Sequence, residues 1–170
     1  GSVDFHELLY EAYAPGGVAL LIDILTDNKN RSAAEVRNTL SKHGGNLGDA
    51  GSVSYLFKRL GVVAIDATHH SEDDVMEVAI EAGALDVVLD DGFVEVITEP
   101  GDFDVVLHGI QVAEISTTGA EIAWVADSPI EMTVKEASSA VRLIDLLEDL
   151  DDVQSVATNL ELKDSVLVGD

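Results

Sequence analysis

Positively charged residues gather in one short part of the sequence, where they could bind an anion. The chain of 170 residues carries 33 acidic and nine basic residues, and its formal net charge is −24. Six of the nine basic residues nevertheless lie between positions 29 and 59: Lys29, Arg31, Arg37, Lys42, Lys58 and Arg59. Lysine and arginine beside the free backbone N–H groups at the start of a helix are suited to hold a phosphate. The pattern predicts a phosphate-binding surface with Arg31 at its centre.

A second interpretation of the same cations stays open. They could be solvated surface groups that neutralise nearby carboxylates, since exposed ion pairs are common and weak. The acidic excess elsewhere fits solubility or a salty cytoplasm, and it opposes polyanion binding outside the cluster. If all six cations met phosphates, the logarithm of the affinity for duplex DNA would fall with the logarithm of salt concentration with a slope of about −5.

Other candidate chemistry is weak. The loop GGNLGDAGS, residues 44–52, lacks the Gly-Lys-Ser/Thr ending of a nucleotide-binding loop and joins a helix to a strand, which is the reverse order. His69 and His70 are adjacent on an extended segment, so they point to opposite faces and do not form a metal site. No serine-hydrolase or zinc-protease motif is present. We therefore expect no enzyme, no cofactor, no metal and no small-molecule substrate.

The elements that position the cluster follow from local patterns. Residues 17–26 form an apolar run after a Pro-Gly-Gly turn, which predicts a buried strand. Ser32 and Glu35 form a capping box for a helix over 32–43 that ends at Gly44. Residues 52–57 and 61–66 are then expected to pair as an antiparallel hairpin, with Gly61 in the connection.

The remaining elements complete an α+β protein with two ferredoxin-like lobes. We expect a helix over 71–83, a hairpin of 85–91 with 92–99, a helix over 103–110 and a strand over 120–126. A helix over 135–149 and a strand within 153–162 would return to the first lobe and give it the order βαββαβ. The first domain would comprise 3–66 and 134–170. The second, with the order αββαβ, would be inserted as 67–133.

Composition restricts the compartment. The chain has no cysteine, which fits a reducing environment, and no apolar run long enough to cross a membrane. We expect a cytoplasmic protein without a membrane partner. Gly1 and Ser2 are interpreted as the remnant of a cleaved expression tag.

Two stretches go beyond fold class and resemble one family. Residues 13–63 contain PGGVA, TDNKNR and SKHGGNLGDAGSVSYLF, and residues 142–159 contain LEDLDDVQSVATN. Both are similar to the YebC/PmpR family. The resemblance implies two α/β domains, one inserted in the other, without the family's N-terminal helical domain. It also implies that the family's basic motif corresponds here to Lys29, Arg31, Arg37, Lys42, His43 and Lys58.

The function that this resemblance implies is non-enzymatic regulation of gene expression, by DNA binding in transcription. The alternative is a ribosome-associated translational activator that binds ribosomal RNA, which would be mitochondrial in a eukaryote. A further alternative, from the acidic composition, is a scaffold for basic protein partners.

Overall fold

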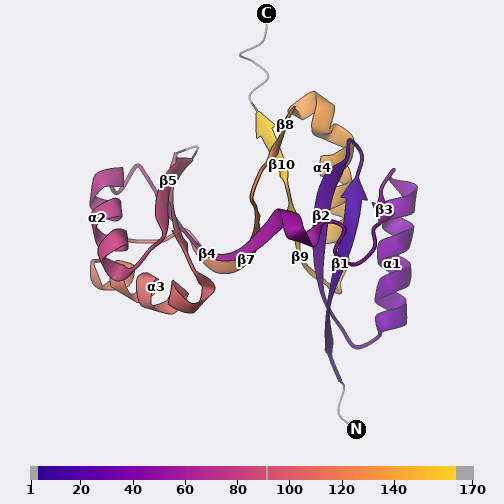
Figure 1. Ribbon diagram of the computed structural model, residues 1–170, viewed down its shortest axis with the longest axis horizontal. Coiled ribbons are helices and arrows are strands. Elements are labelled where there is room, and N and C mark those ends of the chain that lie inside the picture. The colour runs from indigo at the N-terminus through magenta and orange to yellow at the C-terminus, as the bar shows by residue number, and fades with distance from the viewer. Residues whose placement is uncertain (1–3, 91, 164–170) are drawn as a thin grey trace, which may run out of the picture. The chain divides into compact units, whose positions relative to one another are not determined.

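The computed structural model describes residues 4–90 and 92–163 (Figure 1). By their contacts these residues divide into two compact units. Unit 1 comprises the described parts of 1–58 and 125–170, and unit 2 comprises those of 59–124. The chain passes from one unit to the other within strand β4 (Phe57–Asp66) and again within strand β7 (Gly119–Ala126).

Unit 1 is built on a four-stranded sheet. β1 (His6–Ala14) and β2 (Val18–Thr26) form an antiparallel hairpin, and β3 (Asn46–Leu47) and β9 (Val153–Thr158) extend the sheet to the order β3-β1-β2-β9. Gly16 and Gly17 turn the hairpin with φ angles of 89° and 78°, a region that favours glycine. A separate parallel pair joins β8 (Ile130–Thr133) to β10 (Leu160–Lys163).

Two helices of unit 1 pack on one face of this sheet. They are α1 (Lys29–Lys42) and α4 (Val134–Glu148). Val36 and Leu40 of α1 and Leu143 and Leu147 of α4 share one buried cluster with alternate residues of β2. This burial fixes α1 against the sheet and leaves its other side in solvent.

The second face of the same sheet is covered in part by the chain that follows β3. Ala19 and Leu21 point to that face and are each only 1% exposed. Glu11 of β1 accepts hydrogen bonds from backbone N–H groups of the segment 51–54, and the Tyr13 hydroxyl donates to the Ser52 carbonyl at 3.3 Å. The segment continues into a short 3-10 helix, η1 (Ser54–Leu56). The second face is thus covered around Ala19 and Leu21, whereas Leu9 and Leu25 on the same face are 40% and 36% exposed.

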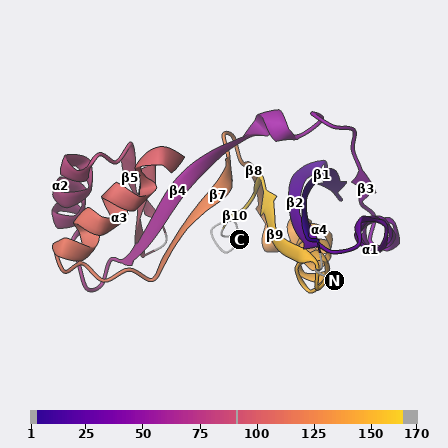
Figure 2. The same ribbon diagram turned by 90° about the horizontal axis from the view of Figure 1, so that it is seen from below.

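Unit 2 has the element order βαββαβ. After β4 come α2 (Glu72–Ala82), β5 (Asp86–Asp90), β6 (Phe93–Thr98), η2 (Pro100–Asp102), α3 (Phe103–Val112) and β7. The strands lie in the order β5-β6-β4-β7, which places β6 between the two strands that α2 connects. This is the split βαβ arrangement. Figure 2 shows α2 and α3 next to each other, and both contribute to one core with the sheet.

The structure confirms a mixed α+β fold but differs from the sequence prediction in unit 1. The hairpin of 52–57 with 61–66 does not form, because 57–66 is one continuous strand. Gly61 lies inside that strand, where a Cβ atom would clash with Thr98 and Phe103, so this glycine serves close packing and not a turn. The strands β1, β3, β8 and β10 were not predicted. The order βαββαβ is found in unit 2 because the strand over 61–66 begins that unit.

Candidate nucleic-acid interface

Helix α1 carries four of the seven predicted site residues. It begins three residues earlier than predicted, because Asn28 and not Ser32 is its N-cap: the Asn28 side chain accepts a hydrogen bond from the Arg31 backbone N–H at 3.0 Å. Ser32 is buried inside the first turn, so the predicted capping box with Glu35 is wrong. The helix ends at His43, whose backbone N–H donates to the Leu40 carbonyl.

Arg31 is held by two carboxylates of its own chain. Its guanidinium lies 2.7 Å from the Asp27 carboxylate and 3.0 Å from that of Asp152. The hydrogen bonds that Arg31 donates to Asp27 and Asp152 raise the pKa of Arg31. Two carboxylates therefore neutralise the guanidinium of Arg31, while Lys29 at the start of α1 has no such partner within the described residues. Arg31 has less positive charge to offer a phosphate than the unpaired cations of α1.

Asp152 connects three elements of unit 1. Its carboxylate accepts hydrogen bonds from the Ser32 hydroxyl at 2.7 Å, from the Thr26 hydroxyl at 3.2 Å and from Arg31. The bond from Ser32 is the strongest cause that lowers its pKa, with Arg31 and Thr26 adding to it against the opposing effect of burial. The carboxylate therefore ties the end of β2 and the start of α1 to the turn before β9.

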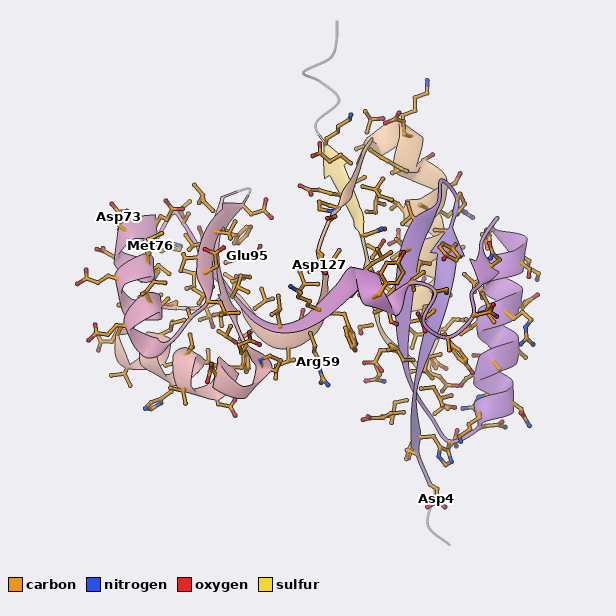
Figure 3. The ribbon with its side chains drawn as sticks, viewed as in Figure 1. Asp4, Arg59, Asp73, Met76, Glu95 and Asp127 are labelled. Carbon is orange, nitrogen blue, oxygen red and sulfur yellow. The ribbon has the colours of Figure 1, made fainter. Side chains whose placement is uncertain are left out.

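Two further predicted residues lie away from α1 in the sequence. Lys58 of unit 1 is 3.7 Å from Asp127, and both side chains are largely exposed, so this pair is weak. Arg59 belongs to unit 2 and makes no ion pair with the described residues. Figure 3 labels Arg59 and Asp127.

The exposed side of α1 is the part of the cluster that stays available. Four small or amide-bearing residues form a stripe along it at positions i, i+4, i+8 and i+11: Asn30, Ala34, Asn38 and Ser41. Arg37 and Lys42 lie on either side of this stripe. Lys29 is seven residues before the buried Val36, so it begins α1 on the side that faces the sheet, but it is exposed in the first turn. These three cations have no ion pair within residues 4–90 and 92–163. We call the stripe with Arg37 and Lys42 the α1 outer face.

The glycine-rich loop after α1 is closed around Glu11. The carboxylate accepts backbone hydrogen bonds from Gly51 at 2.5 Å, Val53 at 2.9 Å and Ser54 at 2.7 Å. Burial raises the pKa of Glu11, but these three bonds outweigh it and lower the pKa. These three N–H groups therefore have a partner and are not free to hold a phosphate.

The histidines make local contacts. His69 Nε2 is 4.0 Å from the Asp66 carboxylate, and His70 Nε2 accepts a hydrogen bond from the Ser116 backbone N–H at 3.3 Å. Across the described ranges, no three histidine, aspartate or glutamate side chains are arranged to hold a metal ion. In the same ranges, no helix combines the length and apolarity needed to span a membrane.

Comparison with known proteins decides the family. Residues 5–160 match the family model described as the TACO1/YebC second and third domain. The chain belongs to this family. A "probable transcriptional regulatory protein" of Treponema denticola is 47% identical over 95% of the chain and 66% of the relative, and one of Legionella pneumophila is 46% identical over 98% and 68%. This chain spans about two thirds of the length of these TACO1/YebC relatives.

A solved TACO1/YebC-like structure supports the fold. The crystal structure of a conserved hypothetical protein from Aquifex aeolicus covers 98% of this chain and 69% of its own, with a TM-score of 0.85 and 39% identity. The family resemblance seen in the sequence is therefore confirmed. The description as a probable transcriptional regulatory protein is that of the relatives.

Sequence reasoning missed the partners of Arg31. Asp27 lies just before the N-cap of α1, only four residues from Arg31, so this partner could have been identified from its closeness in the sequence. Asp152 is 121 positions away in the sequence and carries no local signal.

Proposed function

We propose that this protein is a non-enzymatic regulator of gene expression that binds duplex DNA through the α1 outer face. The observation that carries the proposal is the charge of α1, which holds four basic residues and one acidic residue in a chain of net charge −24. Phosphate contacts from lysine and arginine supply most of the affinity of proteins for DNA. The acidic remainder of the chain limits binding elsewhere by repulsion.

The residues of the α1 outer face have separate roles in this proposal. Arg37 and Lys42, on either side of the stripe, contact phosphates, and Lys29 adds a third contact from the first turn of α1. Asn30 and Asn38 lie between them, with amide groups that can hydrogen-bond to base edges or sugars. Arg31 acts through Asp152 as a positioning residue for the helix.

The other predicted residues are secondary members of the proposed site. His43 is half-buried at the end of α1, Lys58 is paired with Asp127, and Arg59 lies in unit 2. We further assign unit 1 to the family's second domain and unit 2 to its inserted third domain. The boundaries 66/67 and 133/134 expected from the sequence would place the strand over 61–66 in the wrong unit under this assignment.

The proposal is tested by measuring binding of a labelled 20-base-pair duplex across a salt series. Three phosphate contacts predict a log–log slope of about −3. The double variant Arg37→Glu with Lys42→Glu should weaken binding at least about tenfold and flatten the slope, because it replaces two attractions by two repulsions. The matched control is Lys135→Glu with Arg142→Glu, which makes the same change of charge on the exposed side of α4.

Two results would contradict this assignment. Equal losses from both double variants would mean that only total charge matters and that α1 has no special role. Stronger association of the parent chain with ribosomes than with duplex DNA at the same salt concentration would favour the translational alternative.

A further inference from the structure

The sheet of unit 2 has one face on which neither of the unit's described helices packs. Val63 and Ile65 of β4 and Val94 and Val96 of β6 are fully buried in the core with α2 and α3. Because side chains alternate along a strand, the residues between them point to the opposite face. Figures 1 and 2 show α2 and α3 together on one side of these strands.

This opposite face of β5, β6 and β4, which we call the open face, is rich in apolar residues. Five of its nine positions are apolar: Val62, Ala64, Val88, Phe93 and Ile97. Phe93 is 42% exposed and Val88 is 40% exposed. Val62, Ala64 and Ile97 are neighbours in the register, whereas Val88 and Phe93 lie beside carboxylates, so apolar and acidic positions are interleaved on this face. Exposed apolar side chains rimmed by polar residues mark a place where another molecule can bury them.

A carboxylate lies at the centre of the open face. Glu95 is opposite Ala64 on one side and opposite Val88 on the other. It borders a hollow of about 330 Å³ that Asp90, Phe93 and Thr118 also line. Glu95 makes no hydrogen bond or ion pair with the described residues. Its position on the sheet, with Asp73 and Met76 on α2, is labelled in Figure 3.

The environment of Glu95 disfavours its charge. Burial raises the pKa of Glu95, and the nearby Asp90 raises it further. A cation that approaches Glu95 stabilises the ionised carboxylate, because it supplies the missing counter-charge.

The other polar positions of the open face are also acidic. Asp66 accepts hydrogen bonds from Thr68, and Asp86 accepts one from the Val87 backbone N–H. Asp90 has no such partner within the described residues. The nine positions therefore hold four carboxylates, five apolar side chains and no cation.

We propose that the open face docks a segment of a partner protein that presents lysine or arginine side chains flanked by apolar side chains, with one basic group paired to Glu95. Charge complementarity selects this occupant, because a nucleic acid or an acidic peptide would be repelled by four carboxylates. A second copy of this chain fits less well, because each copy carries a formal net charge of −24 and the two copies would repel each other. The inference uses unit 2 alone and is independent of the proposed DNA contact.

The test is a titration of the ¹⁵N-labelled chain with a synthetic ten-residue peptide in which leucine and arginine alternate. We expect amide shift changes concentrated in β4, β5 and β6. Glu95→Lys should weaken binding about tenfold or more, since it replaces the counter-charge with a like charge. Asp73→Lys makes the same change of charge at an exposed position of α2 and should leave the affinity within about twofold.

Three controls keep the test decisive. Glu95→Gln preserves the shape of the side chain and should weaken binding in the same direction, and the spectrum of each free variant shows whether it is folded. A peptide in which serine replaces arginine should bind much less tightly. Equal weakening by Glu95→Lys and Asp73→Lys, or shift changes spread over all acidic surfaces, would overturn the proposal.

Discussion

The sheets of the two units differ in how far the face without helices is covered by other parts of the chain. In unit 1 the chain after β3 covers the middle of the face away from α1 and α4, where Leu21 is only 1% exposed, and leaves Leu9 and Leu25 at 40% and 36% exposure. In unit 2 the equivalent face holds Val88 and Phe93 at 40% and 42% exposure. Both sheets have four strands and two helices on the other side. The difference between Leu21 and Val88 therefore comes from the segment that follows β3, and not from the number of strands or helices.

What covers the sheet of unit 1 is a glycine-rich segment held by one carboxylate. Glu11 binds three backbone N–H groups, and Gly51 supplies a φ of 85° that other residues rarely adopt. On the open face of unit 2, Glu95 occupies the middle of the sheet without any such partner in the described chain. A glutamate of unit 1 thus holds the covering segment in place, whereas a glutamate of unit 2 lies on its sheet without a partner among the described residues.

The largest expected effect comes from placing a charge on each of these faces. Leu21→Asp should lower the free energy of unfolding of unit 1 by about 3–5 kcal/mol, because an unpaired carboxylate would be buried. Val88→Asp, the matched change on the open face, should cost less than about 1 kcal/mol. Urea unfolding measures both, followed by tyrosine signals for unit 1 and by Trp124, the only tryptophan, for unit 2. Similar costs would mean that the two faces are equally covered.

A smaller effect is expected from a substitution of Asp152, which connects three elements of unit 1. Asp152→Asn should cost about 1.5–3 kcal/mol, because it removes the charge that Ser32, Thr26 and Arg31 stabilise. The neighbouring exposed Asp151→Asn should change the free energy of unfolding by less than about 0.5 kcal/mol.

The pKa of Asp152 gives this effect a defined pH dependence. Because its folded-state pKa is lowered, its contribution is fully present above the unfolded value of about 3.9 and is lost as the pH falls through the folded value. The difference between parent and Asp152→Asn should therefore shrink in acid. A difference that stays constant from pH 7 to pH 3 would contradict an ionic role.

The sequence was most informative where one element carries its own signal. The predicted helix over 71–83 corresponds to α2, with Ser71 as its N-cap and Gly83 in the left-handed region at its end. The hairpin of β5 and β6 was found from Asp91-Gly92, although Asp91 itself lies outside the described residues. Capping and turn signals need only neighbouring residues, so they survive without knowledge of the fold.

The candidate site was predictable only in part, because the pairing of its cations depends on residues that are distant in the sequence. The four cations of α1 follow from the sequence, but the neutralisation of Arg31 by Asp152 depends on a contact across 121 positions. Gly61 misled the strand assignment for the same reason, since its close neighbours Thr98 and Phe103 are far away in the sequence. The open face also needed the register of three strands before it could be recognised.

The smallest expected effect tests whether Glu95 is kept for binding. Since the folded state raises its pKa, the ionised carboxylate destabilises unit 2 at neutral pH, and Glu95→Gln should slightly raise the urea midpoint reported by Trp124. The gain should vanish in acid below the ordinary glutamate pKa, because Glu95 is then protonated in both folded and unfolded chains. Glu77→Gln, at an exposed position of α2, should leave the midpoint unchanged. A variant that is more stable but binds the basic peptide less well would show that stability is given up at this position for recognition, whereas a loss of stability would mean that Glu95 has a structural partner.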